Sequence, residues 1–426
     1  MVAFKQFVLA TAWILFFCVV LSGCGESDTK NGIAPLTAPD KSISNLDALR
    51  SLPYAAGSHV GENDESGVVL HDRGRSCPGY NLYSGFRLSM AELIDENGDV
   101  INRWAASPNR TWWNCELQPN GDLLVVGRDV SPASVSDTGP VTNDPRYAMC
   151  LNWQGQVIWK QALLTHHDIE QTPDGNLLVL AYQPRLIPQV HHKIKLRDDL
   201  LVRLKPGGTV IESMSIFEAI NRNPQAFKPT QIVKPNVIGG SKWIDLFHAN
   251  SIEWMHHRHL IGKHPLYALD NVLVCMRHQD RIAVFNWTRG EVVWSWGHGE
   301  ISGPHDAHVL DNGHILLFDN GLARQRSRAI ELDPLSGQIV WQYDPDPSAG
   351  FYTIAGGAVQ RLPNGNTLMT ISDHGRAVEV IPGGEVVWEY YCPHEVAPGQ
   401  RSSMVRMKRY PREYVRKIIE QHQRES

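Results

Sequence analysis

The residues Gly290-Glu291-Val292-Val293-Trp294 decide the fold, because close variants of this stretch return along the chain. The copies share a glycine followed by β-branched residues and, in all but one, a tryptophan: GDVINRW at 98–104, GQVIW at 155–159, GTVIE at 208–212, GEVVW at 290–294, GQIVW at 337–341 and GEVVW at 384–388. Glycine tolerates the positive φ of a tight turn, and β-branched residues favour strands. The six copies therefore predict six β-hairpins.

A second kind of turn alternates with the first. Four copies are recognisable, PNGD at 119–122, PDGN at 173–176, DNGH at 311–314 and PNGN at 363–366, and Asp270-Asn271 is a fifth after an insertion. Two alternating hairpins make one four-stranded blade, and the pattern recurs about every 50 residues. One hairpin of the second kind is missing, and the segment Val68–Ser84 can supply it and close the ring with the C-terminal strands.

The sequence therefore predicts an all-β protein, a six-bladed β-propeller with four-stranded blades, as one domain over residues 67–411. A different blade number is the main structural alternative. Residues 412–426 place apolar side chains among charges and predict a short C-terminal helix or tail.

Composition excludes several classes of protein. The 426 residues carry a formal net charge of −5, and 42% of them are hydrophobic. This apolar content excludes a disordered chain. The weakly acidic net charge gives no sign of the basic surface that nucleic-acid binding normally requires. Beyond the N-terminus no run of 18 apolar residues occurs, which excludes a multi-span membrane protein.

The first residues predict a targeting signal. Lys5 precedes an apolar stretch at Phe7–Leu21, and Ser22-Gly23-Cys24 comes directly after it. This pattern resembles a bacterial lipobox, so residues 1–24 are expected to be a lipoprotein signal peptide and Cys24 to be lipidated. An ordinary cleaved signal and an uncleaved anchor are the alternatives.

The segment after the signal predicts where the protein works. Residues 25–66 are polar and rich in Gly, Ser, Asp and Pro, and predict a tether. Gly25 directly after the lipidated residue favours the outer membrane. We therefore expect a lipid-anchored protein on the periplasmic side of the cell envelope.

Five cysteines remain after Cys18 and Cys24, namely Cys77, Cys115, Cys150, Cys275 and Cys392. An oxidising compartment would allow one or two disulfides, and an odd number leaves at least one thiol unpaired. No CxxC pair occurs, so a thiolate zinc site is not expected.

Histidines recur at one position of the repeat. Eight residues before the second-hairpin glycine stand His305 and His167, and His248 fits the same register in the stretched copy. Trp113 and Gly357 occupy this position in the other two copies. Because a propeller relates equivalent positions by rotation, the three histidines are expected to converge on the central channel. Satisfied structural histidines are the alternative.

Arg277 comes after the strand of the stretched hairpin and adds a cation to this set. Arginine presents forked donors to sulfate or phosphate oxygens, and histidine can act as donor, base or nucleophile. Three histidines could instead bind zinc. Asp168 and Asp306, each directly after a histidine of the set, could ligate a metal or orient an imidazole.

At these residues the chain resembles the bacterial arylsulfotransferases, also called aryl-sulfate sulfotransferases. The resemblance covers about Val68 to Pro411 and rests on these motifs: HHDI at 166–169, FHANS at 247–251, RHQ at 277–279, HDA at 305–307 leading to LFDNG at 317–321, GRAVEV at 375–380 and RMKRYP at 406–411. The resemblance implies a six-bladed propeller, in agreement with the hairpin count.

The resemblance also implies an activity, which is transfer of a sulfo group from an aryl sulfate donor to a phenolic acceptor. The transfer would run through a sulfohistidine, without phosphoadenosine phosphosulfate, any other cofactor or a metal. His305 is then the nucleophile, His248 and Arg277 bind the sulfuryl oxygens, and His167 assists them or handles the phenol proton. The further candidates for substrate binding are Asn320, His308 and Arg376.

Several alternatives stay open. His308, three residues after His305, is the rival nucleophile. A non-catalytic, envelope-anchored scaffold, a metal-dependent propeller hydrolase and a quinoprotein dehydrogenase are the other functional classes. The insertion His256–Leu269 contains four histidines and is expected to cover the channel. The oligomeric state is not indicated by the sequence.

Overall fold

The computed structural model describes residues 58–60, 65–86, 88–106, 110–129, 146–230, 236–238 and 241–425. The chain divides into two compact units, Met1–Asp40 and Lys41–Ser426, and all described residues belong to the second. The expected signal peptide, Cys24 and most of the tether at 25–66 lie outside the described residues.

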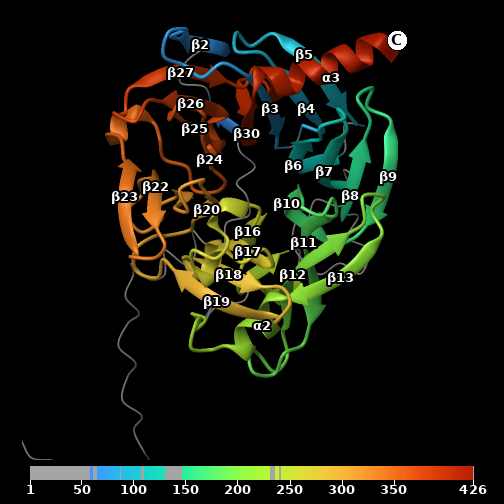
Figure 1. Cartoon of the computed structure of the whole chain (residues 1–426), viewed down its shortest axis with the longest axis vertical. Helices are drawn as coiled ribbons and strands as arrows, with labels where there is room; N and C mark the ends of the chain where they lie inside the picture. Colours follow the sequence, from blue (N-terminus) through green and yellow to red (C-terminus); the bar gives the residue numbers. More distant parts are fainter. Residues whose placement is uncertain are drawn as a thin grey trace, which may run out of the picture. The chain divides into compact units, whose positions relative to one another are not determined.

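Six antiparallel sheets of the second unit are arranged in a ring (Figure 1). Blades one to three comprise β30 (Met404–Tyr410), β3 (Tyr80–Gly85), β4 (Met90–Ile94) and β5 (Val100–Ala105); β6 (Arg110–Leu117), β7 (Leu123–Asp129), β8 (Arg146–Leu151) and β9 (Val157–Ala162); and β10 (Thr165–Gln171), β11 (Leu177–Arg185), β12 (Lys195–Leu204) and β13 (Val210–Ser215). Blades four to six comprise β16 (Ala249–Trp254), β17 (Asn271–Met276), β18 (Arg281–Asn286) and β19 (Glu291–Trp296); β20 (His305–Val309), β21 (Ile315–Asp319), β22 (Arg328–Asp333) and β23 (Gln338–Tyr343); and β24 (Ala358–Arg361), β25 (Thr367–Ile371), β26 (Arg376–Val380) and β27 (Val386–Tyr391). The predicted six-bladed propeller is confirmed.

Short strands and helices are added to the six blades. The additional strands are β2 (Gly67–His71), which pairs with β27; β15 (Ser241–Ile244) and β14 (Asn236–Ile238), which extend the third blade; and a small sheet of β1 (Ser58–Val60), β29 (Gln400–Ser402) and β28 (Glu395–Ala397). The helices are α2 (Ile216–Arg222) and α3 (Arg412–Glu425), with short 3₁₀ turns η1 (Arg258–Leu260), η2 (Pro265–Tyr267), η3 (Arg277–Gln279), η4 (Pro347–Ala349) and η5 (Ser372–His374).

The two ends of the propeller close the ring twice, as the hairpin count predicted. β3 pairs with β30, so the innermost strand of the first blade comes from the C-terminus. β2 pairs with β27 at the outside of the sixth blade. Within β30, Arg409 is buried and its guanidinium donates to Asn81 at 2.8 Å and contacts the buried Glu379. This charge pair fixes the closing strand between its two neighbouring blades.

The tryptophans of the repeat join one blade to the next. Trp104 and Trp388 are fully buried at the outer strands, and each indole N–H donates 2.9 Å to a turn carbonyl of the neighbouring blade, at Asn152 and Glu96 respectively. A buried indole needs a partner for its N–H. The repeated Gly-to-Trp spacing therefore encodes both a hairpin turn and a contact between blades.

The predicted C-terminal helix is confirmed as α3, which buries Val415 and Ile418 against the first and second blades. The five cysteines that remain after the signal are all buried and free, so none of the possible disulfides is present among them. Among the described residues, no helix combines the length and apolarity that crossing a bilayer requires.

Candidate active site

The candidate site lies where the innermost strands of the third, fourth and fifth blades begin. In each of these strands the pairing is interrupted by a β-bulge, between Thr165 and Ile169 in β10, between Ala249 and Ser251 in β16, and between His305 and His308 in β20. Bulges re-aim side chains and are common next to active sites.

Three residues at these bulges have left-handed backbone, His167 with φ 60°, His248 with φ 50° and Asp306 with φ 52°. Such backbone costs about 1–3 kcal/mol for residues other than glycine, and it concentrates at functional sites. The repeat count aligned His167, His248 and His305, but in the fifth blade the left-handed residue is Asp306, one position later.

The ring of His305 is 97% buried and its orientation is fixed by Asn320. The Asn320 amide donates to the carbonyls of Thr353 and Gly356 at 2.9 and 2.8 Å, so its oxygen faces His305 Nδ1 at 2.7 Å. The Gly303 carbonyl lies 3.0 Å from the same nitrogen. With two acceptors around it, Nδ1 carries the proton and Nε2 keeps its lone pair. The Gly356 N–H, 3.3 Å away, donates to Nε2.

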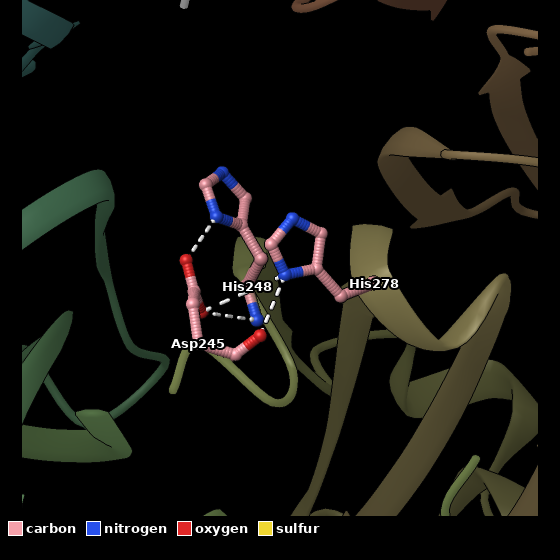
Figure 2. Close-up of side chains that lie close together, drawn as sticks. All are labelled: Asp245, His248 and His278. Atoms are coloured by element: carbon pink, nitrogen blue, oxygen red, sulfur yellow. Dashed lines mark hydrogen bonds and ion pairs between the residues drawn. The ribbon is translucent and has the colours of Figure 1, made fainter. Parts of the chain in front are cut away.

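His248, like His305, is oriented by an acceptor at Nδ1, which here is a carboxylate. Its Nδ1 lies 2.5 Å from Asp245 Oδ2, and its backbone N–H donates to the other Asp245 oxygen at 3.1 Å (Figure 2). A carboxylate accepts, so Nδ1 carries the proton. Nε2 is buried and has no hydrogen-bond partner among the described residues.

Arg277 is 99% buried and lies beside His248, because its backbone N–H donates to the His248 carbonyl at 3.2 Å. The next residue, His278, orients the guanidinium. His278 Nδ1 donates to the Asp245 carbonyl at 2.7 Å, and its Nε2 lies 3.2 Å from Arg277 Nη1. Figure 2 shows the His248 and His278 rings together above Asp245, and their centroids are 4.5 Å apart.

His167 is held by its neighbour His166. His166 Nε2 lies 3.2 Å from the Ala181 carbonyl, which requires a proton on that nitrogen. His166 Nδ1 is then an acceptor, and His167 Nδ1, 2.8 Å away, is its donor. The His167 ring lies 5.0 Å from the ring of His248. The three imidazoles of the predicted set are thus all protonated on Nδ1, with Nε2 as the basic atom.

Burial keeps these imidazoles neutral. Burial, together with the nearby Arg277 charge, lowers the pKa of His305 to about 3. Burial also holds the pKa of His248 and of His167 well below the usual range, with His248 contributing to the latter. A neutral imidazole with a lone pair on Nε2 is the nucleophilic form, and in His305 this lone pair accepts the Gly356 N–H.

Asp245, His248 and His278 lie close enough together to hold a metal ion. Both nitrogens of His278 are however engaged, one by a backbone carbonyl and the other by Arg277. A guanidinium at 3.2 Å from a ligand atom opposes a divalent cation. These three residues are therefore a hydrogen-bond network that orients His248 and Arg277.

The structure separates the remaining candidates. Asn320 lies in the site and orients the His305 ring through the contact of 2.7 Å at Nδ1. Arg376 donates hydrogen bonds to Glu389 at 2.6 Å and to the Ala349 carbonyl at 2.7 Å. His308 lines a cavity of about 1170 Å³ that the innermost strands of all six blades contribute to, and His305 is not among its lining residues.

Asp168 and Asp306 orient no imidazole through any contact found among the described residues. Asp168 accepts from the backbone N–H of Ile252 at 3.0 Å, and Asp306 from that of Val359 at 2.8 Å. Both carboxylates also pair with Arg406 of β30. They therefore tie neighbouring blades together.

Sequence reasoning missed three positioning residues, Asp245, His166 and His278. His166 and His278 stand next to predicted residues within the quoted motifs, and Asp245 precedes His248 by three residues. Adjacency was the only available signal, because none of the three sits at the repeat position that selected the histidines.

Comparison with known proteins gives one family. The model of the family described as Arylsulfotransferase (ASST) matches residues 147–392, more than half of the chain. The match includes His167, His248, Arg277 and His305. No curated protein matches the chain.

Solved structures match this chain only at low identity. A protein of unknown function from Bacteroides caccae is 14% identical with a TM-score of 0.48, over 78% of this chain and 98% of that one. A streptogramin B lyase is 10% identical with a TM-score of 0.43, over 84% and 95%. A virginiamycin B lyase from Staphylococcus aureus is 10% identical with a TM-score of 0.41, over 80% and 86%. Likenesses this distant say nothing about activity.

Proposed function

Because the chain belongs to the arylsulfotransferase (ASST) family, we propose that it transfers a sulfo group from an aryl sulfate ester to a phenol through a sulfohistidine on His305. The observation that carries the proposal is the fixed tautomer of His305. Its Nδ1 proton is held by Asn320 at 2.7 Å, so the Nε2 lone pair belongs to a neutral, buried imidazole.

In the first half-reaction, His305 Nε2 attacks the sulfur of the aryl sulfate. The N–S bond forms as the bond between sulfur and the aryl oxygen breaks, and its electron pair leaves as a phenolate. The His305 ring gains positive charge in this step, which strengthens the Nδ1–H hydrogen bond to Asn320. Nothing in this step requires phosphoadenosine phosphosulfate, because the ester itself is the donor.

Arg277 supplies the permanent cation for the sulfuryl oxygens, whose charge must be stabilised as the bonds exchange. His248 contributes only after its Nε2 takes up a proton. An anion beside Nε2 raises the pKa of His248 from its low value, so donor binding is coupled to proton uptake. Asp245, 2.5 Å from Nδ1, supports the resulting imidazolium.

In the second half-reaction, the phenolic oxygen of the acceptor attacks the sulfur and the N–S bond returns its electrons to Nε2. The phenolic proton passes to a base, and His167 Nε2 fits this role because its Nδ1 proton is already held by His166. The two transfers share one nucleophile and predict ping-pong kinetics.

The test measures the rate at which wild type and single variants release a coloured phenol from an aryl sulfate donor. We expect His305→Ala to have no measurable turnover, and Arg277→Ala and His248→Ala to lose about 10²–10³ in rate. When wild type reacts with the donor in the absence of acceptor and is then quenched, mass spectrometry should find one additional sulfo group on the peptide that contains His305.

His308→Ala is the matched control, because His308 lies on the same strand and lines the central cavity, whereas His305 does not. A sulfo group found on His308, or turnover that survives in His305→Ala and is lost in His308→Ala, would contradict the assignment. A wild-type protein inert toward several aryl sulfates, with and without phenols, would overturn the proposed activity.

We further propose that Cys24 carries a lipid and anchors the protein on the periplasmic side of the outer membrane. The support is the Ser22-Gly23-Cys24 pattern after the apolar stretch, together with the polar segment at 25–66. Cys24→Ser should carry no lipid and remain unprocessed, with the apolar stretch Phe7–Leu21 still attached. If this variant fractionates and is processed like wild type, the anchor proposal is wrong.

A further inference from the structure

The insertion between β16 and β17 places a second histidine cluster far from His305. His248 directly precedes β16 and His256 lies just beyond it, so the two lie at opposite ends of the same innermost strand. At the His256 end, Glu253, His256 and His257 have side-chain ligand atoms that all lie within 4.8 Å of one another. All three residues line the cavity of about 1170 Å³ at the centre of the ring.

We propose that Glu253, His256 and His257 bind a divalent zinc ion at this end of the channel. The two imidazoles and one carboxylate are a ligand set that zinc takes in sites with three protein ligands, in which a fourth position stays open to water or an anion. The proposal is independent of the sulfotransferase activity.

The distances agree with a tetrahedral ion. Glu253 Oε1 lies 3.4 Å from His256 Nδ1 and 3.6 Å from His257 Nε2. Zinc–ligand bonds of about 2.0–2.1 Å at the tetrahedral angle place neighbouring ligand atoms about 3.3 Å apart. The separation of 3.6 Å is also too long for a direct hydrogen bond between the two side chains.

The carboxylate is already oriented. Glu253 is 93% buried, and its Oε2 accepts the backbone N–H of Val309 at 2.5 Å. This bond from the neighbouring blade holds one oxygen and leaves Oε1 directed at the two histidines.

His257 shows the strongest sign of a ligand. It is 93% buried, and its Nε2 has no hydrogen-bond partner among the described residues. Its Nδ1 lies 3.2 Å from Asp311 Oδ1. A carboxylate on the far nitrogen of a histidine is the usual outer partner of a zinc ligand, because it fixes the tautomer that exposes the other nitrogen.

His256 is 53% exposed at its side chain and provides access to solvent. Its Nδ1 also lies 3.2 Å from the Trp254 carbonyl, a contact that metal binding would replace. A second set, His257, His259 and Asp311, also has side-chain ligand atoms that all lie within 4.8 Å of one another. His259 Nε2 is however engaged by the Asp311 carbonyl at 2.6 Å, and the Asp311 side chain is 94% exposed. We therefore assign Asp311 the outer, orienting role.

The experiment titrates ZnCl₂ into the full chain, produced without a histidine tag and stripped with a chelator, and measures binding by calorimetry. We expect one zinc ion per chain for wild type. His256→Ala, at an exposed position, should lose at least about 100-fold in affinity, and Asp311→Asn about 10–100-fold. Glu253→Gln keeps an acceptor for Val309 and should also lose binding.

His259→Ala and His264→Ala are controls within the same insertion, and both should bind zinc as wild type does. Zinc binding that is absent in wild type, or unchanged in both His256→Ala and Glu253→Gln, would overturn the proposal. Loss of binding in His259→Ala with no effect of His256→Ala would also overturn it, in favour of the other set.

Discussion

The pH dependence of the first half-reaction tests the buried, neutral nucleophile directly. If His305 titrated at the ordinary histidine pKa of about 6.5, only about 3% of it would be neutral at pH 5, and the rate would be about thirtyfold lower than at pH 8. With burial and Arg277 holding the pKa at about 3, His305 stays neutral over this whole range. We therefore expect no acid limb between pH 8 and pH 5.

The assay is kcat/KM for an aryl sulfate donor, measured by phenol release at saturating acceptor. In ping-pong kinetics this quantity covers only donor binding and the first transfer, so ionisation of the acceptor phenol does not enter. The donor remains an anion throughout. His248 and His167 have lowered pKa values, so their protonation as pH falls can only strengthen anion binding.

The expected profile is thus flat or rising toward pH 5. A decrease approaching thirtyfold with a midpoint near pH 6.5, in protein whose circular dichroism is unchanged, would refute the reasoning. Arg277→Gln provides an internal check, because loss of this charge should raise the pKa of His305 and move any acid limb to higher pH.

Three further substitutions test the positioning network. Asn320→Ala removes the acceptor that fixes the His305 tautomer, and we expect kcat/KM to fall by about 10²–10⁴ with a protein that still folds. His278→Phe removes one acceptor from Arg277, which should weaken binding of inorganic sulfate at least about tenfold, because a hydrogen bond that involves a charged group contributes about 1.5–3 kcal/mol. Arg406→Gln leaves Asp168 and Asp306 without their cation, and urea unfolding should show a loss of about 3 kcal/mol.

The fold could be predicted because each blade repeats its own local signals. A glycine turn, β-branched residues and a tryptophan specify a hairpin without reference to the rest of the chain, as at Gly290 and Trp294. Ring closure was predictable for a different reason. The count left one hairpin missing, and β30 with β3 supplies it.

The candidate histidines could be predicted only because the rotational symmetry of a propeller relates one blade to the next. His167, His248 and His305 were selected because equivalent positions of a propeller converge, and the structure places all three at the starts of innermost strands. For Arg376, the motif position alone does not say which strand of a blade the side chain occupies. Arg376 begins β26, the third strand, where it pairs with Glu389.

The hydrogen-bond partners of the histidines could not be predicted from the sequence. Asp245 reaches His248 through a loop whose path depends on tertiary packing, and the tautomer of His167 depends on the Ala181 carbonyl of the adjacent strand. Pairings of this kind carry no periodicity. Their consequence, which is the basic Nε2 on His167, His248 and His305, emerges only from the three-dimensional contacts.

The residues beside the candidate histidines explain why the set keeps its geometry. In the third, fourth and fifth blades one side chain accepts a backbone N–H from the next blade: Asp168 from Ile252 at 3.0 Å, Ser251 from Ala307 at 3.0 Å and Asp306 from Val359 at 2.8 Å. These acceptors adjoin the bulges that aim the functional side chains. In β10 and β20 the bulge therefore does two things, since it turns the histidine toward the site and the following aspartate toward the neighbouring blade. In β16 the acceptor Ser251 lies three residues after His248. The distance between histidines of different blades is consequently set by inter-blade hydrogen bonds, and Arg406 on the closing strand spans Asp168 and Asp306 to hold the third and fifth blades to the same register.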